Sequence, residues 1–348
     1  MRDLYSTHET ALQVVFSEIE RYALSQEEVF VGTPGSLTRR KKSDRYFFYS
    51  RQYYDGSGKK REAYVAGPAG DVAADEKAAR LKVRIDEAAG AVASIRLLGR
   101  NGYTLAGAKA QATLAVLHNL GLFSAGAVLV GSHPIGALLN KLGVRAASYA
   151  TEDLDIARGD TLALPKLERH FIDVLRDSGI EFVQVPGLPS SKPATSYKEK
   201  GRSRFHVDLL VPSKDNTFPI VPVPELKAHA QGLPYLAYLL GDTQMTTLIA
   251  REGVAAIRVP SAERFALHKL IVSQLRAGRD ARTARDLAQA AILLAVLADN
   301  HPGAVEDAAA ALPRSGHRHL KRARVALQTN LPQTYTRAWD ALDSLTTR

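Results

Sequence analysis

The sequence predicts an α+β protein whose middle part is a mixed β-sheet with flanking helices. Three observations predict this fold class. Short apolar runs that are typical of strands recur between residues 126 and 212. A basic and aromatic stretch around the turn signal Asp55-Gly56-Ser57-Gly58 predicts an N-terminal β-hairpin. The residues from Pro260 to Arg348 have a helical pattern, which predicts a C-terminal helical bundle.

The length of 348 residues is enough for two or three domains with a sizeable core. We expect four segments: an N-terminal helix and the basic β-hairpin in residues 1–68, a helical spacer in 69–121, a sheet domain with the candidate site in 122–260, and a helical domain in 261–348. The apolar spacing predicts helices at Thr7–Ala23, Asp71–Leu98, Leu105–Leu120, Leu162–Asp177 and Leu233–Leu240. Strands are predicted at Ala127–Val130, Ser148–Ala157, Glu181–Val185, Thr195–Glu199 and Arg204–Val211, and in the hairpin at Leu37–Tyr54 and Lys59–Gly67.

The composition, with 45% hydrophobic and 24% charged residues, is that of a globular protein. No run of about 18 apolar residues occurs and no signal-peptide core is present, so we expect no membrane span. Cysteine is absent, which excludes disulfides, thiolate zinc sites and cysteine nucleophiles and fits a cytoplasmic protein. The net charge of +10 favours a polyanionic partner such as nucleic acid, with a solvated basic surface as the alternative.

The candidate site begins in residues 126–157. An apolar run ends at Gly131-Ser132, a helix-like segment follows, and a second apolar strand carries Asp153 and Asp155. Because side chains alternate along a strand, both aspartates point to one face. Two such carboxylates repel each other unless a cation lies between them, and oxygen ligands of this kind suit Mg²⁺ or Mn²⁺. The Gly131-Ser132 turn offers backbone N–H groups and a hydroxyl to an anion, so metal and phosphate together indicate nucleotide chemistry.

This arrangement resembles the DNA polymerase β-like nucleotidyltransferase superfamily, whose pattern is a strand, Gly-Ser, a helix and Asp-x-Asp on the next strand. A third carboxylate comes from a later strand, and here it matches Asp208 in the run Arg204–Val211. The spacing from Ser132 to Asp153 is longer than the commonest form of the pattern. The resemblance is closest to bacterial nucleotidyltransferase-fold proteins and, more loosely, to abortive-infection toxins. It covers the middle third of the chain strongly and the C-terminal part more weakly.

The resemblance implies an NTP-dependent, two-metal enzyme in which Asp153 and Asp155 bind the metal ions. Asp208 would bind the catalytic metal and accept a proton, and the turn at Gly131 and Ser132 would hold the β- and γ-phosphates. A fortuitous surface strand and a domain that has lost turnover are the alternatives.

A second implied set comes from the C-terminal part of the toxin-like branch. Lys269 would contact the triphosphate, and Asp286 would be required for activity. The alternative is that both are ordinary surface residues of helices.

The predicted hairpin is the candidate nucleic-acid surface. Residues 31–70 contain nine Lys or Arg against three Asp or Glu, together with five tyrosines. Basic residues interleaved with aromatics suit phosphate contacts and base stacking. The residues chosen for these roles are Arg39, Arg40, Lys41, Lys42, Tyr46 and Tyr49. Alternation places Tyr46 with Phe48 on one face and Phe47 with Tyr49 on the other, so one pair is expected to be buried. The alternative is a curled sheet whose aromatics form its own small core.

Two classes of function follow. The first is an enzyme that transfers NMP from an NTP to an acceptor hydroxyl, with RNA, such as a tRNA 3′ end, as the favoured acceptor. A protein or small-molecule acceptor stays open within the same chemistry. The toxin-like resemblance implies a growth-inhibiting or phage-defence role and a cognate antitoxin. The second class is a nucleic-acid-binding module built on an inactive nucleotidyltransferase fold.

Overall fold

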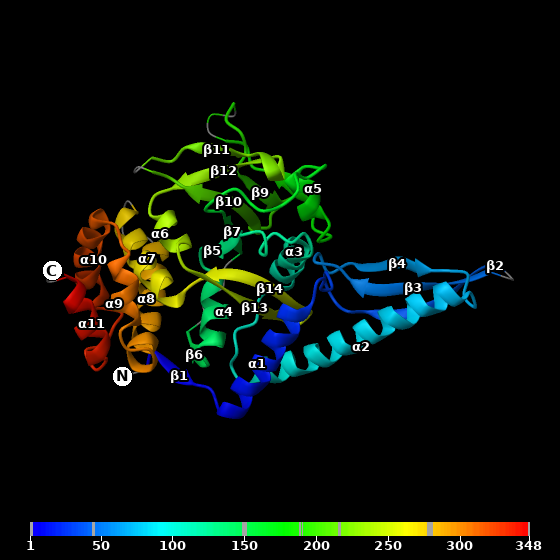
Figure 1. Ribbon diagram of the computed structural model, residues 1–348, viewed down its shortest axis with the longest axis horizontal. Coiled ribbons are helices and arrows are strands. Elements are labelled where there is room, and N and C mark those ends of the chain that lie inside the picture. The colour runs from blue at the N-terminus through cyan, green and yellow to red at the C-terminus, as the bar shows by residue number, and fades with distance from the viewer. Residues whose placement is uncertain are drawn as a thin grey trace.

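The structure, a computed structural model, describes residues 3–43, 46–147, 152–187, 189, 191–214, 217–276 and 281–346. Figure 1 shows a body of sheet and helices, with an arm that projects from it on the side away from the C-terminal helices. In the described part of the chain, no helix is both long and apolar enough to cross a bilayer. The four expected segments stay a prediction, and the largest hydrophobic core draws on residues from both sides of the expected boundaries at 121 and 260.

The central sheet is mixed, as predicted. Its main path follows the order β11-β12-β10-β7-β5, and β9 and β8 extend it beside the first half of β10. The strands are β5 Val128–Val130, β7 Asp153–Ala157, β8 Phe182–Gln184, β9 Ser196–Glu199, β10 His206–Pro212, β11 Ile220–Val223 and β12 Ala228–Leu233. Strand β10 runs parallel to β7 and β12, whereas β5 is antiparallel to β7 and β9 is antiparallel to β10. The first residues of β7 and β10 therefore lie side by side.

Helices and a second hairpin enclose this sheet. The helices of the body are α3 Ala108–Asn119, α4 Pro134–Lys141, α5 Phe171–Arg176 and α6 Leu236–Leu240, with the short 3-10 helix η1 Pro224–Leu226. The hairpin consists of β13 Thr243–Ala250 and β14 Gly253–Pro260, and a small pair joins β1 Tyr5–Thr7 to β6 Val144–Ala146. Sequence reasoning did not assign β13 and β14, because buried strands give a nearly continuous apolar run without alternation.

The C-terminal part is a helical bundle, as predicted. It contains α7 Ala262–Leu275, α8 Ala281–Asn300, α9 Ala304–Ala310, α10 Arg314–Leu327 and α11 Thr336–Thr346. Helix α8 is buried along most of its length, with its run of Ala, Leu and Ile inside the same core as the central sheet. A helix that is apolar on nearly every side must lie at the centre of a bundle, and α8 does.

The arm corrects the predicted two-stranded hairpin. The run Leu37–Tyr54 is two strands, β2 Ser36–Ser43 and β3 Tyr46–Tyr54, and with β4 Lys60–Ala66 they form a three-stranded antiparallel sheet. The boundary between β2 and β3 was not predicted, because the sequence stays basic and aromatic from one strand to the next.

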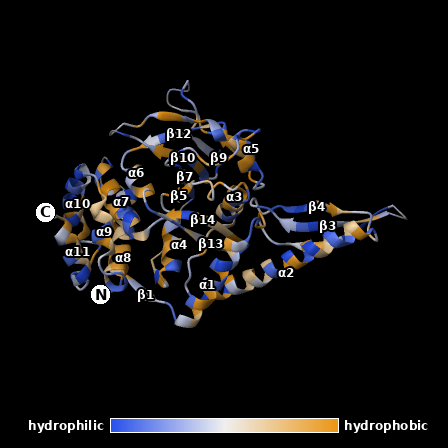
Figure 2. Cartoon of the chain, in the orientation of Figure 1, coloured by the Kyte–Doolittle hydropathy of each residue, from blue (hydrophilic) through white to orange (hydrophobic). Residues whose placement is uncertain are grey.

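Two helices support the arm. Helix α2 Val72–Arg100 packs on the arm sheet, and α1 Thr10–Ser25 packs on α2 and on the body hairpin; both agree with the predicted helices in this region. The Asp71 side chain caps α2 by accepting a bond from the Ala74 N–H. Hydrophobic and hydrophilic residues alternate along α2, which packs its apolar side on the sheet and the body (Figure 2).

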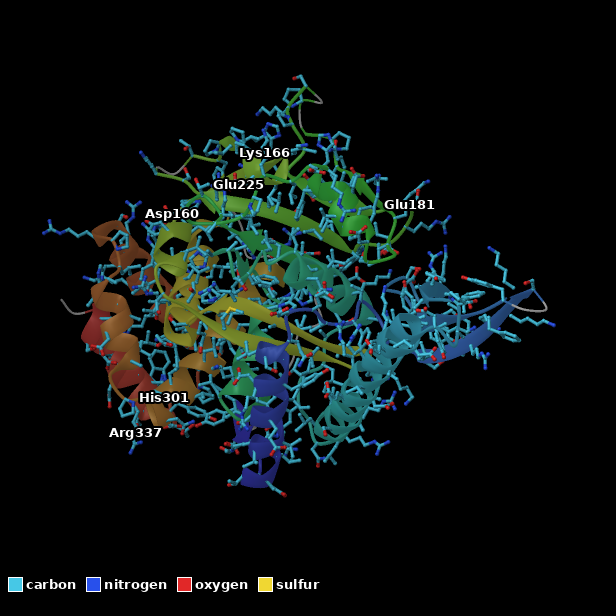
Figure 3. The ribbon with its side chains drawn as sticks, turned by 45° about the vertical axis from the view of Figure 1, so that its right-hand side comes forward. Asp160, Lys166, Glu181, Glu225, His301 and Arg337 are labelled. Atoms are coloured by element: carbon cyan, nitrogen blue, oxygen red, sulfur yellow. The ribbon has the colours of Figure 1, made fainter. Side chains whose placement is uncertain are left out.

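A predicted helix from Leu162 to Asp177 is wrong, because only its last part, α5, is helical. The backbone N–H groups of Leu162 and Ala163 donate to the Glu225 side chain and the Ala125 carbonyl instead of to a helical turn. Glu225 in turn pairs with Arg158 at 3.1 Å. Figure 3 labels Glu225 at this edge of the sheet, together with Asp160. Pro165 also lacks the N–H that a continuous helix needs.

Candidate functional site

The three predicted carboxylates lie on two neighbouring strands. In the parallel register of β7 and β10, His206 is opposite Asp153 and Asp208 is opposite Asp155. Residues paired in this way point to the same face of a sheet, and the residues between them in β7 are buried on the other face. The structure thus brings Asp153, Asp155 and Asp208 together at one face, with His206 among them.

His206 links two of these carboxylates. Its Nδ1 lies 3.2 Å from Asp153 Oδ1, and its Nε2 lies 3.4 Å from Asp208 Oδ2. The hydrogen bond to Asp208 and the surrounding negative charge raise the pKa of His206 to about 9. An imidazolium between two carboxylates compensates part of their repulsion. Alternation along the strand predicts that His206, two residues before Asp208, points to the same face as Asp208.

Asp155 is the most strongly perturbed carboxyl of the site. Burial raises its pKa to about 7, and the charges of Asp208 and Asp153 act in the same direction. Lys269 and His206 oppose this increase only in part. A carboxylate whose ionised form is this unfavourable is one that a bound cation would stabilise.

Gly131 makes room for the Asp155 side chain. It follows the last residue of β5, which is paired with Asp155, and its φ is +77°, in the left-handed region. A Cβ atom at this position would lie 1.8 Å from Asp155 Oδ2. Glycine is therefore needed here both for its backbone conformation and for the close approach of the carboxylate.

We expect Gly131→Ala to lower nucleotide chemistry at this site by about tenfold to hundredfold, because displaced catalytic groups lose much of their effect. Gly126→Ala is the matched control, since Gly126 also has a positive φ, +108°, but a Cβ atom added there would meet no other atom within 4 Å. Steady-state rates and melting curves of both variants provide the measurement. Equal losses in the two variants would attribute the effect to backbone strain rather than to Asp155.

The second predicted pair, Lys269 and Asp286, is also brought together. Lys269 Nζ lies 2.9 Å from Asp286 Oδ1, and Arg276 Nη1 lies 2.8 Å from Asp286 Oδ2. The Lys269 and Asp286 side chains are only 7% and 2% exposed, which excludes the alternative that they are surface residues. Burial lowers the pKa of Lys269, and Asp286 opposes that shift. Sequence reasoning missed Arg276, which follows Lys269 by two helical turns and is part of the same ion-pair cluster.

A cavity of about 130 Å³ connects the two groups of residues. Gly131 and Asp155 form part of its wall, and His268, Lys269 and Arg276 form another part, between apolar side chains. Burial lowers the pKa of His268 to about 3, so this imidazole is neutral at pH 7. The cavity thus has the cationic groups Lys269 and Arg276, which suit a phosphate, and the Asp155 carboxyl in its wall.

Ser132 and His133 lie just beyond this cavity. The chain turns at Gly131-Ser132, and Pro134 begins α4 at the first helical position. His133 is half-buried, loss of hydration lowers its pKa to about 4, and its Nε2 has no hydrogen-bond partner among the described residues. The lining of the cavity includes Gly131 but not Ser132.

A larger cavity of about 1010 Å³ lies elsewhere, at the carboxyl ends of β7, β10 and β12. Arg158, Ser213, Lys214 and Tyr235 are among its lining residues. None of the predicted site residues lines it. Size alone therefore does not identify the reaction centre, and the smaller cavity is the one that Asp155 borders.

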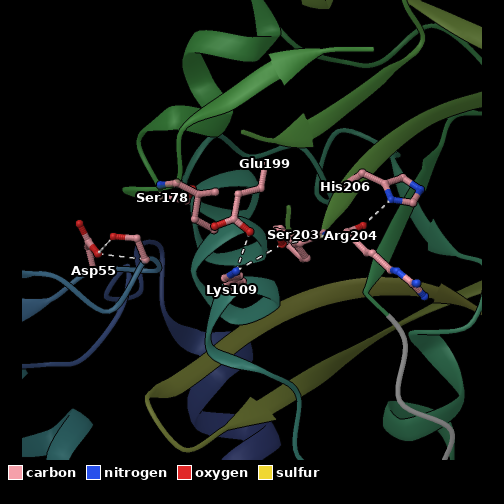
Figure 4. A network of polar contacts seen from close by, with 10 residues as sticks. Asp55, Lys109, Ser178, Glu199, Ser203, Arg204 and His206 are labelled. Atoms are coloured by element: carbon pink, nitrogen blue, oxygen red, sulfur yellow. Dashed lines mark hydrogen bonds and ion pairs between the residues drawn. The ribbon is translucent and has the colours of Figure 1, made fainter. Parts of the chain in front are cut away.

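The turn between β9 and β10 is tied to the body near the carboxylates (Figure 4). Lys109 Nζ, in the first turn of α3, lies 2.5 Å from Glu199 Oε2 and 3.5 Å from Ser203 Oγ. At the other end of the turn, His206 Nδ1 donates to the Arg204 carbonyl at 2.8 Å. These contacts position the strand that carries Asp208.

The arm places its predicted residues on two different faces of its sheet. Tyr49 faces α2, where its hydroxyl donates to Asp75 Oδ1 at 2.9 Å. Tyr46 lies on the other face, with its ring 6.4 Å from that of Phe48. Among the basic residues, Arg40 pairs with Glu62, Arg39 lies over the Phe47 ring, and Lys42 lies over the Tyr46 ring. Lys41 is exposed.

The carboxylate oxygens of Asp153, Asp155 and Asp208 are of the kind that bind hard divalent cations. Carboxylate oxygens are the ligands of Mg²⁺ and Mn²⁺, and the raised pKa of Asp155 reflects burial first and the nearby charge of Asp208 second. Within the described residues, no three His, Asp or Glu side chains are already arranged as a metal site. His206 binds Asp153 and Asp208 in this structure, so a metal would require these side chains to rearrange.

Comparison with known proteins agrees with this geometry. A family model described as "Nucleotidyltransferase" matches residues 108–313, a range that contains every residue of the carboxylate site and of the Lys269 cluster. Neither the search of curated proteins nor the search of solved structures found a match. The matched range covers more than half of the chain and begins at α3, after the arm.

Proposed function

Because the chain belongs to this nucleotidyltransferase family, we propose that it transfers a nucleoside monophosphate from an NTP to an acceptor hydroxyl at the carboxylate site. The observation that carries the proposal is the register of β7 and β10, which sets Asp155 beside Asp208. Gly131 and Lys269 border the same small cavity as Asp155. A triphosphate is stabilised by such cations and N–H groups and by metal ions that carboxylates hold.

The proposed reaction is an in-line displacement. The acceptor oxygen attacks the α-phosphorus, the bond from that phosphorus to the bridging β-phosphate oxygen breaks, and pyrophosphate leaves. Asp208 accepts the proton of the attacking hydroxyl, and Lys269 balances charge on the phosphates. Asp153, Asp155 and Asp208 are the residues that would hold Mg²⁺ or Mn²⁺. When bound, such ions neutralise phosphate charge and lower the pKa of the acceptor hydroxyl.

The metal proposal has a test that does not depend on activity. Asp155 has a raised pKa, so the metal-free protein loses stability as the pH rises from about 4 towards 7. His206 also has a raised pKa, and its contribution is present below about 6.5 and lost as the pH rises through about 9. Both effects act in the same direction. We therefore expect Mg²⁺ to raise the melting temperature more at pH 8.5 than at pH 5.5.

Thermal scans with and without Mg²⁺ at the two pH values measure this difference. Asp155→Asn, which has no carboxyl to titrate at this position, is the control. In this variant the difference between the Mg²⁺ effects at the two pH values should be much smaller. An equal Mg²⁺ effect at both pH values, or one unchanged in Asp155→Asn, would mean that the ion binds elsewhere.

We propose RNA as the acceptor class, with the tRNA 3′ end as one candidate. The support is the net charge of +10 and the basic arm. The experiment is incubation of the protein with each labelled NTP, Mg²⁺ and total RNA, followed by separation of RNA from protein. Label in RNA supports the proposal. Label in protein or in a small molecule would mean that the same reaction uses another acceptor.

If the protein is instead an inactive nucleic-acid-binding module, no label from any NTP should be incorporated. The observation against it is that all three carboxylates share one face, together with a lysine that lines the adjoining cavity. A protein without turnover has no need to keep an unfavourable carboxyl such as Asp155.

We also propose a growth-inhibiting role, in phage defence or as a toxin with a cognate antitoxin. The support is the Lys269–Asp286 ion pair, which unites the two residues implied by the toxin-like resemblance. Induced expression of the wild-type chain should slow growth, whereas Asp155→Asn should not. Equal growth of both strains would argue against this role.

A further inference from the structure

The two faces of the arm sheet have different surroundings. One face packs on α2 through Val65, Tyr49 and Leu37, which contact Ala74 and Leu81 of the helix. The opposite face, here called the free face, carries Tyr46, Phe48 and Tyr64. Among the described residues, Figure 1 draws no helix or strand of the body over this face. The sequence-based choice of Tyr49 for base stacking is therefore replaced by residues of the free face.

The three rings of the free face form a continuous cluster. The Phe48 ring lies 6.4 Å from that of Tyr46 and 5.8 Å from that of Tyr64, and both pairs are tilted. Tyr64 is 63% exposed, which is unusual for a side chain of this size. An exposed aromatic cluster on an open sheet is a surface on which flat groups can stack.

Positive charge is concentrated in the arm sheet, and Lys42 lies beside the cluster, over the Tyr46 ring. The described residues of the arm sheet, 36–43 and 46–66, contain eight Lys or Arg against two acids, which leaves a net charge of +6. Both acids are already paired, Asp55 with Arg61 at 2.6 Å and Glu62 with Arg40 at 2.8 Å. Residues 71–87 of the helix on the other side have four basic residues and five acids, a net charge of −1. The excess charge of the arm is thus confined to its sheet.

We propose that the free face binds single-stranded RNA, with bases stacked on the aromatic cluster and phosphates held by Lys42 and other basic residues of the arm sheet. Flat aromatic surface together with cationic surroundings suits a single strand, whose bases are available, better than a duplex. The inference rests on the proposed function in that the bound RNA is the acceptor of transfer.

The base of the arm is seated on the body beside α3. The Gly56 N–H, in the turn between β3 and β4, donates to the Ser178 carbonyl of the body at 2.9 Å. A Cβ atom at Gly56 would lie 2.6 Å from both the Ser178 oxygen and the Ala112 Cβ of α3, so this turn is tightly seated. Helix α3 also carries Lys109, which holds the turn before β10. The aromatic cluster lies towards the start of β3, so an RNA strand bound there would have to follow β3 to this turn to reach the body.

The test is binding of an unstructured RNA oligonucleotide to the full chain, without NTP, measured by fluorescence anisotropy at several salt concentrations. We expect Tyr64→Ala to raise the Kd about 5- to 150-fold, the range for loss of one base stack, with little change in the salt dependence. Tyr54→Ala is the matched control, since Tyr54 is 53% exposed on the same sheet but outside the cluster, and it should bind as the wild type does.

Lysine variants separate local contacts from overall charge. Lys42, whose Nζ lies 5.9 Å from the Tyr46 ring, is next to the cluster, whereas Lys77 is exposed on α2. Lys42→Gln should reduce the log–log salt slope by about 0.7, while Lys77→Gln, which removes the same charge, should leave it unchanged. A duplex of the same sequence should bind more weakly and be insensitive to Tyr64→Ala.

The results distinguish this inference from the proposed function. Binding that is equal in Tyr64→Ala, Tyr54→Ala and the wild type would overturn the free face as an RNA surface, and so would equal effects of the two lysine variants. Asp155→Asn should bind RNA like the wild type although it transfers no nucleotide. RNA binding that depends on Tyr64, without label transfer to RNA, would support the free face and reject RNA as the acceptor.

Discussion

Asp155→Asn is expected to reduce nucleotidyl transfer by about 10³-fold or more and, at the same time, to raise the melting temperature of the metal-free protein at pH 8. The loss of transfer follows because the substitution removes a charged ligand from the site that stabilises the transition state. The gain in stability follows because it removes a buried negative charge that Asp208 and Asp153 repel. Few other substitutions would change rate and stability in these opposite directions.

The matched control is Asp160→Asn, in the exposed segment that follows β7, which should change neither quantity. Transfer is measured with labelled NTP, and stability by thermal scans without divalent ions. The double variant Asp153→Asn/Asp155→Asn should be no less active than Asp155→Asn alone, because ligands of one site act as a unit. Full activity of Asp155→Asn would mean that the chemistry takes place elsewhere.

The sequence allowed the positions of the carboxylates to be predicted because their arrangement depends on local properties. Alternation along a strand placed Asp153 and Asp155 on one face without knowledge of the rest of the fold. The pairing of His206 with Asp153, by contrast, depends on the register of β7 and β10, which are separated by a long segment. His206 was recognised as a neighbour of Asp208, but its ion pair with Asp153 could not be foreseen.

The errors have a common physical origin in tertiary contacts. Residues 162–170 have a helical pattern, but their N–H groups find partners in Ala125 and Glu225, which sequence spacing does not reveal. Arg276 follows α7 and Asp286 lies on α8, so their ion pair depends on how these two helices pack. Likewise, the assignment of Tyr49 to the covered face of the arm depends on where α2 lies.

Asp286→Ala is expected to destabilise the protein by about 3–5 kcal/mol, because it leaves the cation of Lys269 buried without its partner. Transfer should also be lost, but that loss alone would not distinguish a role in the reaction from a role in folding. The double variant Lys269→Met/Asp286→Leu separates the two. Replacing a buried ion pair by apolar side chains of similar size is often close to neutral in stability.

The double variant should therefore recover most of the melting temperature of the wild type, since Arg276 is 35% exposed and can turn towards solvent. Transfer should stay at the level of Asp286→Ala, because Lys269 is the cation that faces Asp155 across the small cavity. Chemical denaturation and labelled-NTP assays on all three proteins give the comparison. If the double variant regains both stability and transfer, Lys269 supports the fold only, and the triphosphate must be bound by other residues.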